Sequence, residues 1–187
     1  FLKFGLHYDE IFKTGLLLNY TGKRLLFRNS ILSLDMIVGD SPRYYFNYFI
    51  DNGYIPGIGL YASGMQFDLK NRDNNVTETW KWFRNEAYIQ SVWKDKFAIG
   101  GGISFDYFER EDATGSNLFT QRYLSPYLFI KTDTQDDKDF PTKGFFISAE
   151  SKALGVLSSE NLSKPVQIKA DIRFNFPLSK AFTYRLN

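Results

Sequence analysis

Few residues in this chain have the type and spacing that a catalytic or metal-binding site needs. His7 is the single histidine, and it lies among the polar positions of the segment FLKFGLHY. A serine hydrolase would need that histidine beside a nucleophilic serine, and the chain has no Gly-x-Ser-x-Gly sequence to supply one. Zinc sites of the usual kind also lack their ligands, because the chain has no cysteine and a single histidine. The sequence therefore predicts no catalytic residue and no metal ligand in this chain.

Two other stretches invite a chemical interpretation, and each has a simpler structural one. The carboxylates within Asp136–Asp139 could bind calcium, but a charge cluster between two strands is typical of a solvated turn. The triple glycine Gly100–Gly102 lies inside a strand pattern, whereas a phosphate-binding loop joins a strand to a helix. We expect these glycines to mark a bend or close packing, and we predict no cofactor. The net charge of +2, with acidic and basic residues interleaved, also gives no basic patch for nucleic acid.

Alternation of apolar and polar residues is the dominant pattern of the chain. Segment 166–176 (VQIKADIRFNF) alternates without interruption, and successive side chains of an extended strand point to opposite faces. This segment therefore predicts a strand with one apolar and one polar face. Similar segments, separated by turn-forming residues, predict about eleven strands and no helix, so the expected fold class is all-β. The expected strands are residues 1–8, 14–22, 31–38, 44–51, 58–69, 76–93, 97–109, 122–134, 144–154, 166–176 and 180–187.

Two kinds of protein contain such two-faced strands. A soluble β-barrel turns the apolar face inward around a ligand, whereas an outer-membrane β-barrel turns it outward into lipid. Many of the expected strands reach the length of about nine to eleven residues that a tilted strand needs to cross a bilayer. Aromatic residues make up 18% of the chain, and such residues form the interfacial girdles of membrane barrels. The sequence favours a transmembrane antiparallel β-barrel, with a soluble ligand-binding β-barrel as the alternative.

The membrane interpretation assigns the two faces of each strand. We expect the polar residues of segment 166–176 to line the barrel lumen and its apolar residues to contact lipid. The expected lumen-facing residues are Lys169, Asp171 and Arg173, and the expected lipid-facing residues are Val166, Ile168, Ile172, Phe174 and Phe176. Corresponding polar positions in other strands are held by Asp35, Asn47, Glu150 and Lys152.

One segment is more specific than a pattern of alternation. Residues 133–151 read DTQDDKDFPTKGFFISAES, which resembles the strand-turn-strand signature of the bacterial surface antigen superfamily, the BamA- and TamA-type outer-membrane barrels. The family pattern has Asp-x-Arg-Asp, a short spacer, an aromatic residue, Pro-Thr-Arg/Lys-Gly and then an alternating strand. The matching residues are Asp133, Asp136, Phe140, Pro141, Thr142, Lys143 and Gly144, while Gln135 stands where the family usually has arginine.

The N-terminal residues 5–51 are similar to the opening hairpins of the patatin-fused branch of this family. A strand that ends in Tyr-Asp, an LLLN strand, an SLD strand and a Gly-x-x-Pro-Arg-Tyr sequence follow one another in family order. The resemblance implies one partial barrel domain over residues 1–187. It also implies that these are about eleven strands of a barrel of about sixteen, with the remaining strands on the C-terminal side.

The resemblance further implies a location and a role. The location is the bacterial outer membrane, and the barrel would anchor, display or translocate an N-terminal patatin-like phospholipase domain that is not in this chain. The alternative within the family is the barrel of an outer-membrane protein assembly or translocation factor. Implied partners are outer-membrane lipid and an upstream periplasmic or lipase domain of the same protein, with a homo-oligomer or a larger outer-membrane complex as further options. Any lipase activity would belong to the upstream domain.

Overall fold

The computed structural model describes residues 1–9, 13–70, 77–94, 96–137, 141–155, 165–177 and 183–186. These residues form one antiparallel sheet of eleven strands. The strands are β1 (Leu2–Asp9), β2 (Lys13–Lys23), β3 (Ser30–Gly39), β4 (Arg43–Ile50), β5 (Gly57–Lys70), β6 (Thr77–Trp93), β7 (Phe97–Glu111), β8 (Asn117–Asp133), β9 (Gly144–Ala153), β10 (Val166–Pro177) and β11 (Thr183–Leu186).

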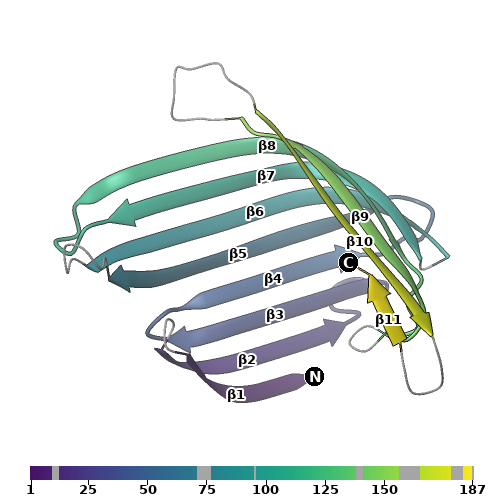
Figure 1. Cartoon of the computed structure of the whole chain (residues 1–187), viewed down its shortest axis with the longest axis horizontal. Coiled ribbons are helices and arrows are strands. Elements are labelled where there is room, and N and C mark those ends of the chain that lie inside the picture. The colour runs from purple at the N-terminus through teal and green to yellow at the C-terminus, as the bar shows by residue number, and fades with distance from the viewer. Residues whose placement is uncertain are drawn as a thin grey trace.

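The strands follow one another in the sheet in sequence order, from β1 to β11. This order arises because most connections are short, and a short connection can join two strands only as an antiparallel hairpin. Figure 1 shows the sheet as a curved wall, in which β9, β10 and β11 bend away from the plane of β1–β8 and β10 crosses in front of the longer strands. The described residues thus form an open, strongly curved sheet of the kind that builds a barrel wall.

The expected all-β fold is confirmed, and so is the expected number of strands. β6 and β8 have 17 residues each, well above the mean of about five or six for strands in globular proteins. None of the described residues lies in a helix that is long and apolar enough to cross a membrane. Of the expected last strand, residues 180–187, the structure describes only Thr183–Leu186.

One strand begins earlier than the sequence pattern predicts. β8 starts at Asn117 and not at residue 122, because the preceding turn is confined to Asp112–Ser116. Oδ1 of Asp112 accepts hydrogen bonds from the backbone nitrogens of Thr114 at 2.8 Å and Ser116 at 2.9 Å, and from the Thr114 hydroxyl at 2.6 Å. These bonds, led by that of the hydroxyl, hold the pKa of the Asp112 carboxyl below its usual value. The chain therefore reverses within five residues, and strand pairing resumes at once.

Candidate functional site on the polar face of the sheet

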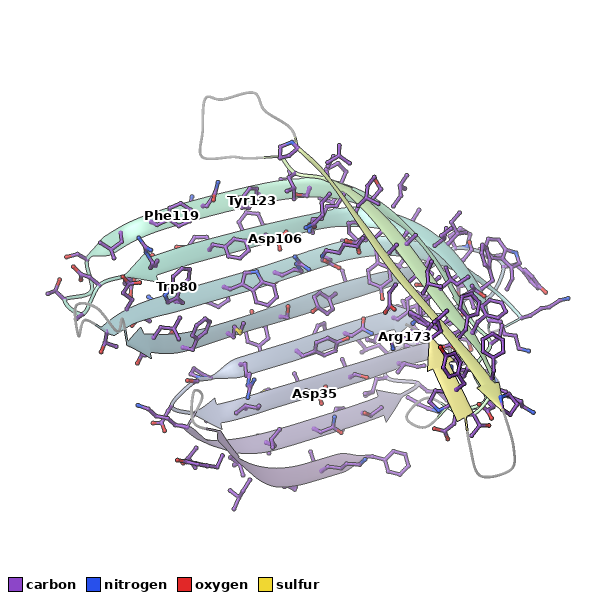
Figure 2. All side chains as sticks on the ribbon, viewed as in Figure 1. Asp35, Trp80, Asp106, Phe119, Tyr123 and Arg173 are labelled. Atoms are coloured by element: carbon purple, nitrogen blue, oxygen red, sulfur yellow. The ribbon has the colours of Figure 1, made fainter. Side chains whose placement is uncertain are left out.

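Strand register gathers the polar side chains on one face of the sheet, which we call the polar face. A single row of register partners on this face contains Asn19, Asp35, Tyr45, Ser63, Arg84, Asp106 and Tyr123, from β2 to β8. The opposite surface, which we call the apolar face, carries the adjacent row of Phe4, Leu18, Met36, Tyr44, Gly64, Phe83, Tyr107 and Arg122. Figure 2 labels Asp35, Asp106, Tyr123 and other members of the polar face on the ribbon.

Contacts that span an intervening strand indicate that the polar face is the concave face of the curved sheet. Side chains converge on the concave side of a sheet, so residues two strands apart can meet there across the strand between them. Three described hydrogen bonds on the polar face span an intervening strand in this way. They are Lys152 Nζ to Asp106 Oδ2 at 2.9 Å, Tyr127 hydroxyl to Glu86 Oε2 at 3.1 Å, and Tyr88 hydroxyl to Asn47 Oδ1 at 3.2 Å.

Asp106 is the centre of a buried charge cluster on this face. It is 3% exposed, and its ion-pair partner Lys152 from β9 is 2% exposed. Oδ1 of Asp106 accepts a hydrogen bond from Nε of Arg84 at 2.6 Å, and Oδ2 accepts one from the Ser104 hydroxyl at 3.2 Å. Because both carboxylate oxygens are bonded by cations, the cost of removing the charge from water is offset by three donors. The cluster ties β6, β7 and β9 together.

Glu86 extends the charge cluster toward the next row of residues. Its carboxylate lies 3.7 Å from Nε of Arg84 and accepts the hydrogen bond of the Tyr127 hydroxyl. On the other side of Asp106, Lys169 of β10 lines a hollow of about 240 Å³ together with Arg84 and Lys152. The polar face therefore holds a network of opposite charges that joins β6, β7 and β9 and includes the Tyr127 hydroxyl of β8.

Glycines on the polar face provide the room that large aromatic rings need. A Cβ on Gly59 would lie 2.0 Å from the Tyr88 ring, and one on Gly100 would lie 2.6 Å from the Phe129 ring. The rings therefore lie flat over backbone that has no side chain. Tyr88 also stacks on Phe49, with ring centroids 6.0 Å apart. The interpretation of the triple glycine at 100–102 as a place of close packing is confirmed.

The apolar face has the dimensions of a membrane-spanning belt. On β7 its side chains are apolar from Phe97 through Ile103 to Tyr107, and Glu109 is the first charged one. These ten residue steps at about 3.4 Å cover about 34 Å of strand, or about 26 Å across a bilayer at a tilt of about 40°. The belt of an outer-membrane barrel is about 25 Å high and has aromatic residues at both edges. Asn85 on β6 is a polar exception within the belt, and Arg122 on β8 lies at its edge over the Tyr107 ring.

The family motif forms the turn between β8 and β9. Oδ1 of Asp136 accepts hydrogen bonds from the backbone nitrogens of Thr142 at 2.9 Å and Lys143 at 3.1 Å, and Oδ2 accepts one from the Thr142 hydroxyl. These bonds, led by that of the hydroxyl, hold the pKa of the Asp136 carboxyl well below its usual value. Gly144 has a φ of 99°, and a Cβ there would lie 2.4 Å from the carbonyl oxygen of Thr134. The position therefore requires glycine.

Other motif residues complete this turn. Oδ1 of Asp133 accepts a hydrogen bond from the backbone nitrogen of Gln135 at 3.1 Å, and Pro141 is buried. Phe140 lies outside the described residues. Among the described motif residues, Asp133 and Asp136 thus have a structural role, because each accepts hydrogen bonds from the backbone of the turn itself. Among the described residues, no group of three or more histidine, cysteine or acidic side chains could hold a metal ion.

The residues predicted from segment 166–176 occupy alternate faces of β10. Lys169, Asp171 and Arg173 are in register with polar-face residues of β9, and Asp171 and Arg173 form an ion pair beside the Phe146 ring. The predicted lipid-facing residues lie together on the apolar face, where Ile168 is 77% exposed and Phe174 packs against Phe145 at 6.2 Å. The others on that face are Val166, Ile172 and Phe176.

Sequence reasoning missed the charge cluster as a unit. Lys152 was expected on a polar position, but its partner Asp106 was not singled out. Both residues hold polar positions of an alternating strand, so their shared face was predictable. Their contact was not, because it depends on the curvature that brings β7 and β9 together across β8.

Comparison with protein families places the chain in one of them. The sequence model of a family described as the OMP85 superfamily matches residues 1–187. A search of curated protein sequences finds no significant match.

Comparison with solved structures identifies a similar fold. The structure resembles that of BamA from Haemophilus ducreyi lacking POTRA domains 1-3, with a TM-score of 0.66 and 12% sequence identity. The similarity covers 97% of this chain and 38% of that chain. This chain therefore spans well under half the length of the protein that it resembles, and at this identity the similarity concerns the fold alone.

Proposed function

This chain belongs to the OMP85 superfamily, and on that premise we propose that it is the barrel wall of a protein that anchors, displays or translocates polypeptide. As an OMP85-type chain with a BamA-like fold, it is an integral β-barrel protein of the bacterial outer membrane. This membership decides against the soluble ligand-binding barrel.

The two faces of the sheet support this role. We assign the apolar face to lipid and the polar face to the lumen, with Val166, Ile168, Ile172, Phe174 and Phe176 in the first group and Lys169, Asp171 and Arg173 in the second. The observation that carries the assignment is the convergence of buried charges on the concave face. Charged residues inside a barrel contact water and one another, whereas the same residues on the convex face would face hydrocarbon.

The polypeptide that we propose for the barrel is a patatin-like phospholipase domain preceding it in the same protein. Support comes from the N-terminal hairpins, where the sequences of β1–β4 follow the order of the patatin-fused branch. The second candidate is the barrel of an assembly or translocation factor that handles other proteins, a role that membership of the OMP85 superfamily also accommodates. Both roles use the same barrel, so they differ in the upstream domain and in the cargo.

The two roles are separable with the full-length protein in its own cells. In the first role, washed outer membranes from cells that express it hydrolyse a fluorogenic phospholipid, and the activity sediments with the membrane. Mutation of the serine in an upstream Gly-x-Ser-x-Gly sequence abolishes that hydrolysis and leaves the amount of barrel unchanged.

The second role predicts a different outcome. Depletion of the protein then lowers the amounts of other outer-membrane barrel proteins, measured by quantitative proteomics of the outer membrane. Membranes without lipase activity, combined with such a loss, would overturn the patatin-like proposal in favour of the assembly factor.

A further inference from the structure

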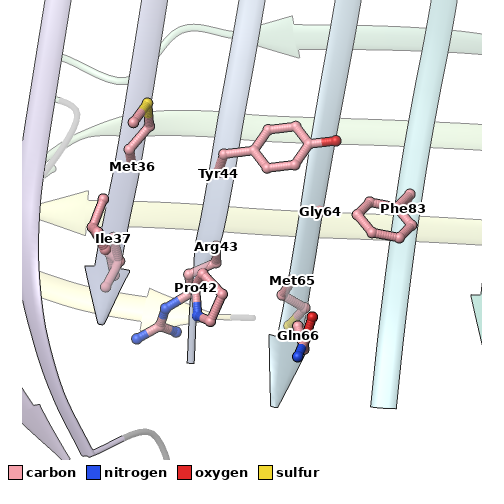
Figure 3. A pocket seen from close by; sticks show the side chains of 10 residues that line it. Met36, Ile37, Pro42, Arg43, Tyr44, Gly64, Met65, Gln66 and Phe83 are labelled. Atoms are coloured by element: carbon pink, nitrogen blue, oxygen red, sulfur yellow. The ribbon is translucent and has the colours of Figure 1, made fainter. Parts of the chain in front are cut away.

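The four longest strands run beyond the apolar belt at one end of the sheet. They are β5, β6, β7 and β8, with 14, 17, 15 and 17 residues. Figure 3 shows this border on β5, where Gly64 lies between Tyr44 and Phe83 and is followed by Met65 and Gln66. We call the part of the four strands beyond this border the extension, which comprises residues 65–70, 77–82, 108–111 and 117–121.

In the extension the two sides of the sheet exchange their character. The convex side, which is apolar within the belt, carries the register row of Gln66, Lys81, Glu109 and Thr120. Lys81 forms ion pairs there with Glu109 and Glu111. Because such charged groups avoid hydrocarbon, the extension lies outside the acyl region of the bilayer.

Aromatic rings collect on the concave side of the extension. Trp82 packs against Phe108 with ring centroids 6.3 Å apart, and Phe108 meets the ring of Tyr123 edge-on at 6.1 Å. The next register row on this side contains Phe67, Trp80, Arg110 and Phe119. Figure 2 shows Trp80 and Phe119 toward the ends of their strands that lie away from β9–β11.

These rings are open to contact with another element. Phe119 is 46% exposed, and Leu69 on the same side is 41% exposed. Within the described part of the chain each strand contacts only its neighbours in the sheet, so no further strand packs over the rings. An apolar sheet face is stable when another element covers it, and a concentrated apolar patch outside the membrane belt indicates an interaction surface.

The edge of β8 beside these rings is also open. β9 pairs with β8 only from Tyr127 to Asp133, and the last bond across this edge among the described residues runs from the nitrogen of Leu124 to the carbonyl oxygen of Gly155 at 2.8 Å. Alternate residues of an antiparallel strand direct their N–H and C=O groups to the same side. Arg122 and Thr120 therefore direct theirs to the open edge, as Leu124 does, and such an edge is a template for a further strand.

We propose that an extended segment of the polypeptide that the barrel handles adds as a strand to this edge of β8. The segment pairs with the backbone of Thr120 and Arg122, and its apolar side chains lie on the concave side beside Phe119 and Tyr123. The proposal rests on the proposed function, which makes a polypeptide the cargo, and names the place of contact. Lipid and saccharide could touch the rings, but only another backbone offers donors and acceptors at the spacing of a strand.

The pairing dictates the pattern of the bound segment. Residues directly opposite each other in an antiparallel pair share a face of the sheet. Those opposite Thr120 and Arg122 therefore place polar side chains on the convex side and direct their N–H groups at β8. The apolar residues between them direct their N–H groups away from β8, so only the N–H groups of the polar residues contribute to binding.

The test uses a fluorescent eight-residue peptide that alternates valine and threonine, titrated with the full-length protein in lipid nanodiscs and followed by fluorescence anisotropy. We expect saturable binding, and at least tenfold weaker binding when the threonine nitrogens of the peptide are methylated. The matched control is the same peptide with methylated valine nitrogens, which should bind like the unmethylated one. In the protein, Thr120→Pro removes one N–H group from the edge and should weaken binding at least tenfold, whereas Thr120→Val keeps it and should leave binding unchanged.

Three results would overturn the proposal. They are no saturable binding to the unaltered protein, an equal effect of methylation at valine and at threonine, and unchanged binding by Thr120→Pro. If Thr120→Pro does not insert, the two methylated peptides still decide, because they leave the protein unaltered. Failure of the proposed function looks different, because membranes would then show neither the lipase activity nor the loss of other barrel proteins, whatever the peptide does.

Discussion

Replacement of Lys152 by methionine tests whether the charge cluster holds the barrel wall together. The change removes the ammonium group and keeps a side chain of similar length, so its main effect is to deprive Asp106 of one ion-pair partner. Asp106 is 3% exposed and cannot recover that interaction from water. It keeps the Arg84 guanidinium at 2.6 Å and the Ser104 hydroxyl at 3.2 Å.

The structure sets the expected magnitude. Removal of one member of a buried ion pair costs about 3–5 kcal/mol when the other charge is left alone. Because Arg84 still compensates Asp106, we expect Lys152→Met to lower the free energy of unfolding by about 2–3 kcal/mol. The double variant Lys152→Met/Asp106→Asn should be more stable than the sum of the single effects predicts, with a coupling of at least about 1 kcal/mol.

Urea unfolding from lipid vesicles measures these differences, with the fluorescence of Trp80, Trp82 and Trp93 on β6 as the readout. Lys169→Met is the matched control, because Lys169 lies on the same face and is exposed. It should change the stability by less than about 1 kcal/mol. A loss in Lys152→Met no larger than in Lys169→Met, or strictly additive single variants, would refute the reasoning.

Three further changes test other parts of the structure. Ile172→Arg should lower the stability of the vesicle-inserted protein by about 2–4 kcal/mol, whereas Asp171→Asn should cost less than about 1 kcal/mol; the reverse order in urea titrations contradicts the face assignment. Gly144→Ala should lower the free energy of unfolding by about 1–3 kcal/mol, because alanine is strained at the positive φ of this position. A urea unfolding midpoint equal to that of the unaltered protein would contradict this strain. The pKa of the Asp136 carboxyl is depressed from its ordinary value of 3.8, so the carboxylate stabilises the turn at every pH above 3.8 and loses this effect as pH falls through the lower folded pKa. Amide hydrogen exchange at Thr142 should therefore stay slow at pH 4. Faster exchange at that pH would contradict the stabilising role of the carboxylate.

Strand alternation was enough to predict the sheet and its two faces. The predicted strand 166–176 corresponds to β10, which ends one residue later at Pro177, and its polar and apolar residues lie on opposite faces. This success has a physical reason: a strand has a side-chain period of two, so composition along the strand maps directly onto faces.

Contacts between distant strands could not be predicted in the same way. The pair Lys152–Asp106 and the bond from Tyr88 to Asn47 depend on sheet curvature and on the small residues between the partners. Alternation also does not identify Gly64 as a position without room for a side chain, because this depends on the Tyr44 and Phe83 rings of the neighbouring strands. The motif turn was predicted as a turn, whereas the hydrogen bonds of Asp136 that close it come from the structure.

The most direct test of the central claim is the environment of each residue along β10 in the inserted, full-length protein. Because this chain has no cysteine, spin labels can be attached through single cysteines at 166, 168, 169, 171, 172 and 173. Paramagnetic resonance then compares collisions with oxygen, which dissolves in lipid, and with a water-soluble nickel complex. We predict preferential oxygen access at Val166, Ile168 and Ile172, and preferential nickel access at Lys169, Asp171 and Arg173. Nickel access at all six positions, or the opposite alternation, would contradict the account.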